Sequence, residues 1–108
     1  MTQRRVNMTA GAERDLALLV EYIAKRDLLR KAEHVLAKLT TLIESLAEHA
    51  ERRVVVGELR AIGITQYQQV VRKPYRVVFE IQADTVFVLV IVDGRRDLQT
   101  LLQQRLLT

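Results

Sequence analysis

Arginine supplies most of the chemistry that this sequence offers. The 108 residues carry 17 Lys and Arg against 13 Asp and Glu, and 13 of the 17 cations are arginines. Arg72, Lys73 and Arg76 surround one turn, and Arg95 and Arg96 follow the next long apolar segment. Guanidinium groups bind phosphates and carboxylates through two parallel hydrogen bonds. The spacing therefore predicts a basic patch that recognises a target of opposite charge.

Ordinary surface electrostatics is the alternative interpretation of the same residues. Arg96 could pair with Asp97 beside it or with Glu80 on the preceding strand. Exposed ion pairs of this kind are common and stabilise a fold by about 1 kcal/mol at most. Both interpretations of the arginines stay open at the level of the sequence.

Groups that transfer protons or bind metals are scarce. The chain has no Cys, and its two histidines, His34 and His49, fall within one helical segment. Without cysteine, the chain cannot form disulfide bonds, thiolate metal sites or a cysteine nucleophile. We therefore expect neither a metal nor a cofactor. Tyr67 is expected to begin a strand, where its hydroxyl could be exposed. Tyr75 falls on an apolar strand face and is expected in the core.

Length and composition are typical of one small globular domain spanning residues 1–108. Hydrophobic residues make up 49% of the chain and charged residues 28%. The longest apolar run, Val86 to Val92, is far too short to cross a bilayer. The first residues carry Arg4 and Arg5 without the apolar run of a secretory signal. We expect a cytoplasmic protein with no membrane partner.

The first half of the chain predicts two helices. Thr9 is a suitable N-cap for the first helix, and apolar residues then recur at helical spacing from Ala12 to Ile23. A break near Arg26 and Asp27 precedes a longer apolar stripe between Leu28 and Ala50. Its sevenfold repeat is compatible with a coiled coil, but the breadth of the stripe favours a helix packed on a sheet.

The second half predicts strands. Short β-branched pieces are expected at residues 54–56 and 59–64, and a strand at 67–72 ends at the turn of Lys73 and Pro74. Within residues 75–82, one strand face is wholly apolar and the other presents Arg76 and Glu80, and Ala83 with Asp84 can close a hairpin. Residues 85–92 are apolar throughout, as in a strand covered on both faces. Leucines from residue 98 to 107 predict a short C-terminal helix.

Together these elements predict an α+β fold. A two-helix hairpin is expected to pack on an antiparallel sheet of three to four strands, with an N-terminal strand and a short C-terminal helix. The chain resembles the RelE/ParE superfamily of bacterial type II toxins over nearly its full length. The resemblance is carried by the helix pair ending at residues 42–46, by Glu58-Leu59-Arg60, by the strand at 74–81, and by Val92-Asp93-Gly94-Arg95-Arg96-Asp97-Leu98.

The resemblance implies one of two activities. RelE-like members are ribonucleases that cut mRNA in the ribosome, and under that alternative Arg76, Arg96 and Tyr67 would be the catalytic candidates. Residues 97–102 contain no Tyr or His where such a nuclease would place its proton-transfer group. ParE-like members instead bind DNA gyrase and block replication by protein contact. We therefore expect a ParE-like toxin without catalytic residues of its own.

The resemblance also implies a cognate antitoxin, with which the toxin could form a hetero-oligomer. Such a partner should be acidic and amphipathic, and it should lie along the helical hairpin. The candidate docking residues are Leu28, Leu29, Leu36 and Ile43, whichever of them the sheet leaves uncovered. In ParE-like proteins the C-terminal region is implicated in toxicity. In this chain that region contains Leu102, Arg105 and Leu106.

A nucleic-acid-binding module is the second alternative, from a different functional class. Its basic sheet face would hold RNA or DNA directly. The strand positions beside Arg76 are Val78 and Glu80, whereas a stacking platform for bases needs aromatic rings. The sequence therefore favours binding of a protein over direct binding of a nucleic acid.

Overall fold

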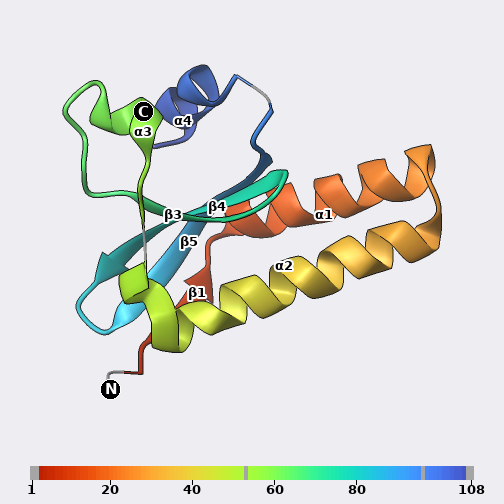
Figure 1. Ribbon diagram of the computed structural model, residues 1–108, viewed down its shortest axis with the longest axis horizontal. Helices are drawn as coiled ribbons and strands as arrows, with labels where there is room; N and C mark the ends of the chain where they lie inside the picture. The colour runs from red at the N-terminus through yellow and green to blue at the C-terminus, as the bar shows by residue number, and fades with distance from the viewer. Residues whose placement is uncertain (1–2, 53, 96, 107–108) are drawn as a thin grey trace.

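A five-stranded sheet lies between a long helical hairpin and a pair of short helices (Figure 1). The computed structural model describes residues 3–52, 54–95 and 97–106. In chain order the elements are β1 (Arg5–Met8), α1 (Ala10–Arg26), α2 (Leu29–His49), a 3-10 turn (Ala50–Arg52), β2 (Val54–Val55), α3 (Gly57–Arg60), β3 (Gln68–Arg72), β4 (Tyr75–Gln82), β5 (Thr85–Asp93) and α4 (Leu98–Leu106).

The sheet has the strand order β1-β5-β4-β3-β2. Strands β2 to β5 form antiparallel pairs, and β1 joins the edge of β5 in parallel. The sequence-based expectation of three to four strands is therefore wrong in number, although the α+β class is confirmed. Strand β2 falls within the short β-branched piece expected at residues 54–56, although its two residues are too few to show an alternating pattern.

The helical hairpin covers one face of the sheet, as expected. Thr9 caps α1, since its hydroxyl oxygen accepts a hydrogen bond from the Ala12 backbone N–H at 3.2 Å. Along α2, Ala32, Leu39 and Leu46 are buried against the sheet and α1, which excludes the coiled-coil interpretation. Within the described residues, no helix combines the length and hydropathy that a bilayer span needs.

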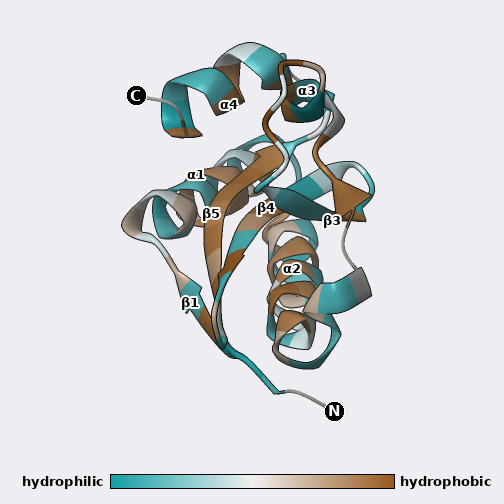
Figure 2. Cartoon of the chain, turned by 90° about the vertical axis from the view of Figure 1, so that its left-hand side faces the viewer, coloured by the Kyte–Doolittle hydropathy of each residue, from teal (hydrophilic) through white to brown (hydrophobic). Residues whose placement is uncertain are grey.

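A second core lies on the opposite face of the sheet. Figure 2 shows the two short helices α3 and α4 next to each other at the top of the view. The buried residues of this core come from the β2–α3 segment, from Tyr67, from β4 and β5, and from α4. They are Val56, Leu59, Tyr67, Val78, Val90, Val92, Leu98 and Leu102. Strand β5 therefore contributes to both cores, which explains why its sequence is apolar without alternation.

Two sequence-based expectations fail in this second core. Residues 59–64 are not strand pieces, because residues 57–60 form α3 and Gly63, with φ of +83°, lies in the turn that follows. One helical turn lets Leu59 enter the core while Glu58 reaches the sheet. Tyr67 is not exposed: only 8% of its surface is accessible, and it packs in the second core.

Candidate partner-binding site

The predicted basic patch is divided between the two faces of the sheet. In the β3–β4 hairpin Arg72 lies opposite Tyr75, and Val71 lies opposite Arg76. Because paired residues share a face and neighbours alternate, Arg72 and Arg76 point in opposite directions. Arg72 borders a groove beside α2, whereas the Arg76 side chain reaches α3. The two arginines therefore do not form a patch on one face of the sheet.

Arg76 is held in a hydrogen-bonded ion pair. Its two terminal nitrogens donate to the two carboxylate oxygens of Glu58, each at 2.8 Å, and its Nε donates to Gln69 Oε1 at 2.6 Å. Only 14% of the Arg76 side chain is exposed. Hydrogen bonding from Arg76 lowers the pKa of Glu58 below its usual value and outweighs the opposing effect of partial burial. This arginine therefore joins α3 to β3 and β4.

Gly94 makes room for the Arg76 side chain. A Cβ at this position would approach Arg76 Cδ to 2.7 Å and the Pro74 carbonyl oxygen to 3.1 Å. The Gly94 backbone N–H donates to that same carbonyl at 2.7 Å. Close packing at the end of β5 therefore requires glycine and keeps Arg76 directed towards Glu58.

The remaining members of the predicted patch lie apart from Arg76. Arg95 is exposed and donates two side-chain hydrogen bonds to the Asp93 carboxylate, which raises the pKa of Arg95 above its usual value. Lys73 is exposed in the β3–β4 turn. Arg96 lies outside the described residues. Of the nuclease candidates, Arg76 is ion-paired and Tyr67 is buried.

The C-terminal helix is anchored to α1 and to the edge of β5. Arg105 pairs with Asp15 at 2.8 Å and donates to the Leu89 carbonyl oxygen at 3.1 Å. The other Asp15 oxygen accepts the Ile91 backbone N–H at 3.0 Å. These side chains satisfy backbone groups of β5 beyond Val88, where its pairing with β1 ends.

The anchor has consequences for the residues expected to carry toxicity. Leu102 is fully buried in the second core, Leu106 is half-buried against it, and Arg105 is engaged in the anchor. Leu107, which the sequence placed in the C-terminal helix, lies with Thr108 outside the described residues. The described part of α4 is thus packed on the sheet.

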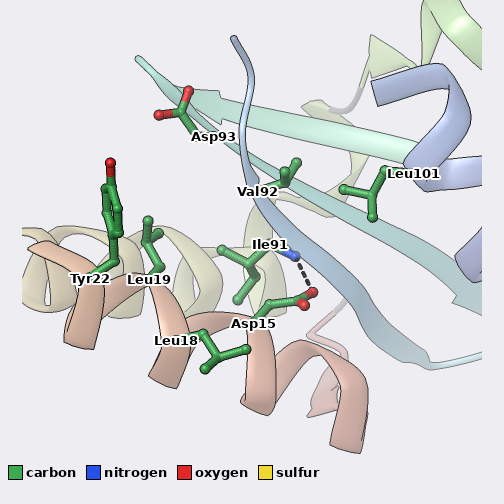
Figure 3. Close-up of a pocket in the computed structure, with 8 residues that line it drawn as sticks. All are labelled: Asp15, Leu18, Leu19, Tyr22, Ile91, Val92, Asp93 and Leu101. Carbon is green, nitrogen blue, oxygen red and sulfur yellow. Dashed lines mark hydrogen bonds between the residues drawn. The ribbon is translucent and has the colours of Figure 1, made fainter. Parts of the chain in front are cut away.

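An apolar hollow lies between α1, β5 and α4 (Figure 3). It has a volume of about 500 Å³, and Asp15 closes one side through its bond to Ile91. Leu18 and Tyr22, one helical turn apart on α1, are 58% and 56% exposed at its rim. The lining residues are Asp15, Leu18, Leu19, Tyr22, Ile91, Val92, Asp93 and Leu101.

Sequence reasoning did not single out this hollow. The available signal was Leu18 and Tyr22, two large apolar side chains at i and i+4 outside the buried stripe of α1. Arg26 extends the same row, because it donates to the Tyr22 hydroxyl at 2.8 Å and its guanidinium lies 5.5 Å from the ring centroid. Exposed apolar surface beside a hollow is typical of protein-binding sites.

A second apolar hollow lies along the helical hairpin. It has a volume of about 490 Å³ and is lined by Met8, Glu13, Leu16, Ala17, Val20, Glu21 and Leu36. Of the four residues considered for antitoxin docking, Leu28, Leu29 and Leu36 are exposed. Ile43 is 5% exposed and belongs to the core of the hairpin. Because Ile43 is buried in this core, it is not available to a docked antitoxin.

Comparisons with known proteins agree with this fold. One chain from the chromosomal ParDE toxin–antitoxin system of P. aeruginosa superposes on this protein with a TM-score of 0.70 and 13% sequence identity. The superposition covers 84% of this chain and 96% of that chain. The RelBE2 toxin–antitoxin complex from Mycobacterium tuberculosis gives a TM-score of 0.64 and 20% identity, covering 86% and 93%. At these identities the likeness concerns the fold.

Sequence comparison identifies the family. A search of curated proteins gave no significant match. The sequence model of one family, described as the ParE toxin of the parDE type II toxin–antitoxin system, matches residues 6–98. That match spans both helices of the hairpin, strands β2 to β5 and all of β1 except Arg5. The chain therefore belongs to the ParE toxin family of type II toxin–antitoxin systems.

Proposed function

We propose that this ParE-like toxin blocks replication by binding DNA gyrase, without a chemical step of its own. The observation that carries the proposal is the state of Arg76. A nuclease would direct this arginine to a phosphate, but here both terminal nitrogens are bonded to Glu58. Tyr67, the nearest proton-transfer candidate from the sequence, is packed in the second core. The ion pairing of Arg76 and the burial of Tyr67 therefore favour a toxin that acts by protein contact over one that cleaves phosphodiester bonds.

The hollow between α1, β5 and α4 is the proposed contact surface for the target. Leu18 and Tyr22 offer exposed apolar area at its rim, and Arg95 lies at the end of β5 beside Asp93, one of its lining residues. Aromatic and arginine side chains of this kind contribute most of the binding energy in many protein interfaces. The adjoining α4 belongs to the C-terminal region that the family resemblance associates with toxicity.

A cognate antitoxin is proposed to neutralise the toxin at the helical hairpin. Leu36 borders the second hollow, and Leu28 and Leu29 are exposed at the tip of the hairpin. An amphipathic helix laid in this hollow would cover these leucines. The two solved structures described above both come from toxin–antitoxin systems, which supports a partner of this kind.

Two assays run side by side test the target. Purified toxin is added to DNA gyrase in a supercoiling assay and to translating ribosomes in an mRNA cleavage assay. We expect inhibition of supercoiling and intact mRNA. Cleaved mRNA with unaffected supercoiling would show that the RelE-like alternative is correct. RNA binding without gyrase or ribosome would favour the nucleic-acid module.

A pair of variants tests the contact surface. Tyr22→Ala removes the aromatic ring at the rim of the hollow and should weaken gyrase inhibition at least tenfold, the effect of losing an interface anchor worth about 1.4 kcal/mol or more. Ile62→Ala removes a comparably exposed apolar side chain after α3 and should leave inhibition unchanged. Equal effects of the two substitutions would place the contact elsewhere.

A further inference from the structure

One side of α1 carries both the rim of the hollow between α1, β5 and α4 and part of the attachment of α4. Residues placed three or four positions apart form a single row along this side of the helix: Gly11, Asp15, Leu18 and Tyr22. Leu18 and Tyr22 lie at the rim of the hollow, and Asp15 closes one side of it (Figure 3). Gly11 begins the row, one turn before Asp15.

Gly11 leaves open the space that the end of the Arg105 side chain occupies. A Cβ on residue 11 would overlap the terminal nitrogen Nη2 of Arg105 and would lie 3.4 Å from its Cζ. That nitrogen donates to the Leu89 carbonyl oxygen of β5 at 3.1 Å, and Nη1 donates to Asp15 Oδ1 at 2.8 Å. The guanidinium therefore lies in a slot bounded by Gly11, Asp15 and the Leu89 carbonyl, which we call the Arg105 slot.

The two hydrogen bonds keep Arg105 from yielding freely to a larger residue at position 11. An unbound arginine side chain has many rotamers and would move aside for a methyl group. Here a shift large enough to remove the overlap would break the bond to Leu89, the bond to Asp15, or both. Only 17% of the Asp15 side chain is exposed, so this carboxylate would lose its cationic partner without full solvation in return. Residue 11 and Arg105 are therefore coupled.

Arg105 also fixes the orientation of the α4 residue that lines the hollow. Leu101 precedes Arg105 by about one helical turn, so both side chains project from the same side of α4. Leu98 and Leu102 hold the helix on the second core, but apolar contacts are non-directional and do not by themselves fix its rotation. The directional bonds of Arg105 therefore determine where Leu101 stands against α1 and β5.

We propose that Gly11 is a positioning residue for target binding. By leaving the Arg105 slot open, it holds α4 in the orientation in which the hollow binds its partner. This role rests on the proposed function, in which the hollow is the contact surface, and it applies to any protein target that binds there. Neither Gly11 nor Arg105 lines the hollow, so both act on it through Leu101 and the edge of β5. A residue that touches no ligand changes binding in this way when it selects one orientation of an element.

A double-mutant cycle in urea tests the slot in the intact toxin. Gly11→Ala in the wild-type background should lower the unfolding midpoint, because the new methyl group displaces Arg105 from its two bonds. In an Arg105→Ala background the same substitution meets no guanidinium and introduces a better helix former, so the midpoint should stay the same or rise. Gly57→Ala at the start of α3 is the matched control. A Cβ at residue 57 has no neighbour within 4 Å, so the midpoint should not fall.

Target binding is measured as inhibition of DNA gyrase and, independently of the identity of the target, as growth arrest at matched levels of soluble toxin. Gly11→Ala and Arg105→Ala should each weaken both effects about fivefold, as is typical of residues that couple to a site without touching its ligand. The double variant should be at least as stable as Arg105→Ala and equally weak as a toxin. Activity would then follow the orientation of α4 and not the stability of the fold. Gly57→Ala should remain as active as the wild type.

Two results would overturn the proposal. An equal loss of stability from Gly11→Ala with and without Arg105 would show that the guanidinium does not occupy the slot in solution. Undiminished growth arrest by Gly11→Ala would show that the toxin acts without this orientation of α4. Growth arrest by the wild type without inhibition of gyrase would instead reject gyrase as the target, and the growth-arrest comparison would still decide the role of Gly11.

Discussion

Arg76 shows how one neighbouring carboxylate changes the role of a side chain. Without a carboxylate nearby, an arginine whose cross-strand partners are two valines would be a suitable phosphate ligand. Here the side chain is directed to Glu58 and Gln69, and its charge is neutralised within the fold. Its substitution should therefore affect stability before it affects recognition of any partner.

Arg76→Ala should lower the free energy of unfolding by about 2 kcal/mol, because it leaves Glu58 without its charged hydrogen-bond donor. Glu58→Gln should cost less, and the double variant should cost less than the sum of the two single changes. Urea denaturation of the four proteins measures this coupling. Strictly additive effects would show that the two side chains do not interact in solution.

Acidification should weaken the same contact. Since Arg76 lowers the pKa of Glu58 in the folded state, the ionised carboxylate stabilises the fold above the unfolded-state value of about 4.3. That contribution is lost as the pH falls through the lower folded-state pKa. Melting temperatures measured between neutral pH and strongly acidic pH should therefore fall less steeply for Glu58→Gln than for the wild type. Glu33→Gln, which removes an exposed carboxyl group of α2, is the control.

Helix α4 depends on side chains that are distant in sequence. Asp15 and Arg105 are separated by 90 positions, and together they bond two backbone groups on the uncovered edge of β5. Leu98 and Leu102 complete the attachment by packing in the second core. An element with this anchor is a structural part of the molecule as well as a candidate contact region.

Asp15→Ala should loosen α4 and the edge of β5 together. It removes the acceptor for Ile91 and the partner of Arg105, and we expect a loss of about 2 kcal/mol. Hydrogen exchange should accelerate at Ile91 and through residues 98–106. Asp15→Asn retains an acceptor oxygen and should protect Ile91 better than Ala does. Glu13→Ala, which removes an exposed carboxylate from the same helix, is the control, and equal acceleration in it would contradict the anchor.

The whole molecule is organised around a sheet that is covered on both faces. Val77 and Phe79 face the hairpin core, whereas Val78 lies in the second core between them in sequence. The register of β4 and β5 shifts at Val78 and Phe79, where Val78 pairs with Val90 and Phe79 with Val88. The intervening Leu89 has its carbonyl free to accept from Arg105. This irregularity links the sheet to α4.

We propose that the two cores unfold in one cooperative transition, as a single domain would. Leu39→Ala in the hairpin core and Leu102→Ala in the second core should each cost about 3 kcal/mol, because both side chains are fully buried. Leu29→Ala removes an exposed side chain and should change stability by less than about 0.5 kcal/mol. Circular dichroism and hydrogen exchange at Val88 and Val90 should report the same midpoint. Early loss of α4 in Leu102→Ala would show that the layers unfold separately.

Local patterns in the sequence determined most of the fold. Thr9 as a cap, the helix break at Asp27, the turn at Lys73 and Pro74 and the hairpin at Ala83 and Asp84 all depend on near neighbours, and the structure contains each of them. The resemblance to the ParE family was also readable from short segments, and the family match confirms it.

Only the tertiary structure decided which charges are free. The sequence placed Arg72 and Arg76 in one patch, but side-chain alternation in a paired strand sends them to opposite faces. The carboxylates that bind Arg76 and Arg105 lie 18 and 90 positions away. A local sequence pattern cannot predict such ion pairs, because residues far apart in the chain meet only when the sheet and helices pack together. The same packing buries Tyr67 and leaves Lys38 and Arg72 exposed beside one groove.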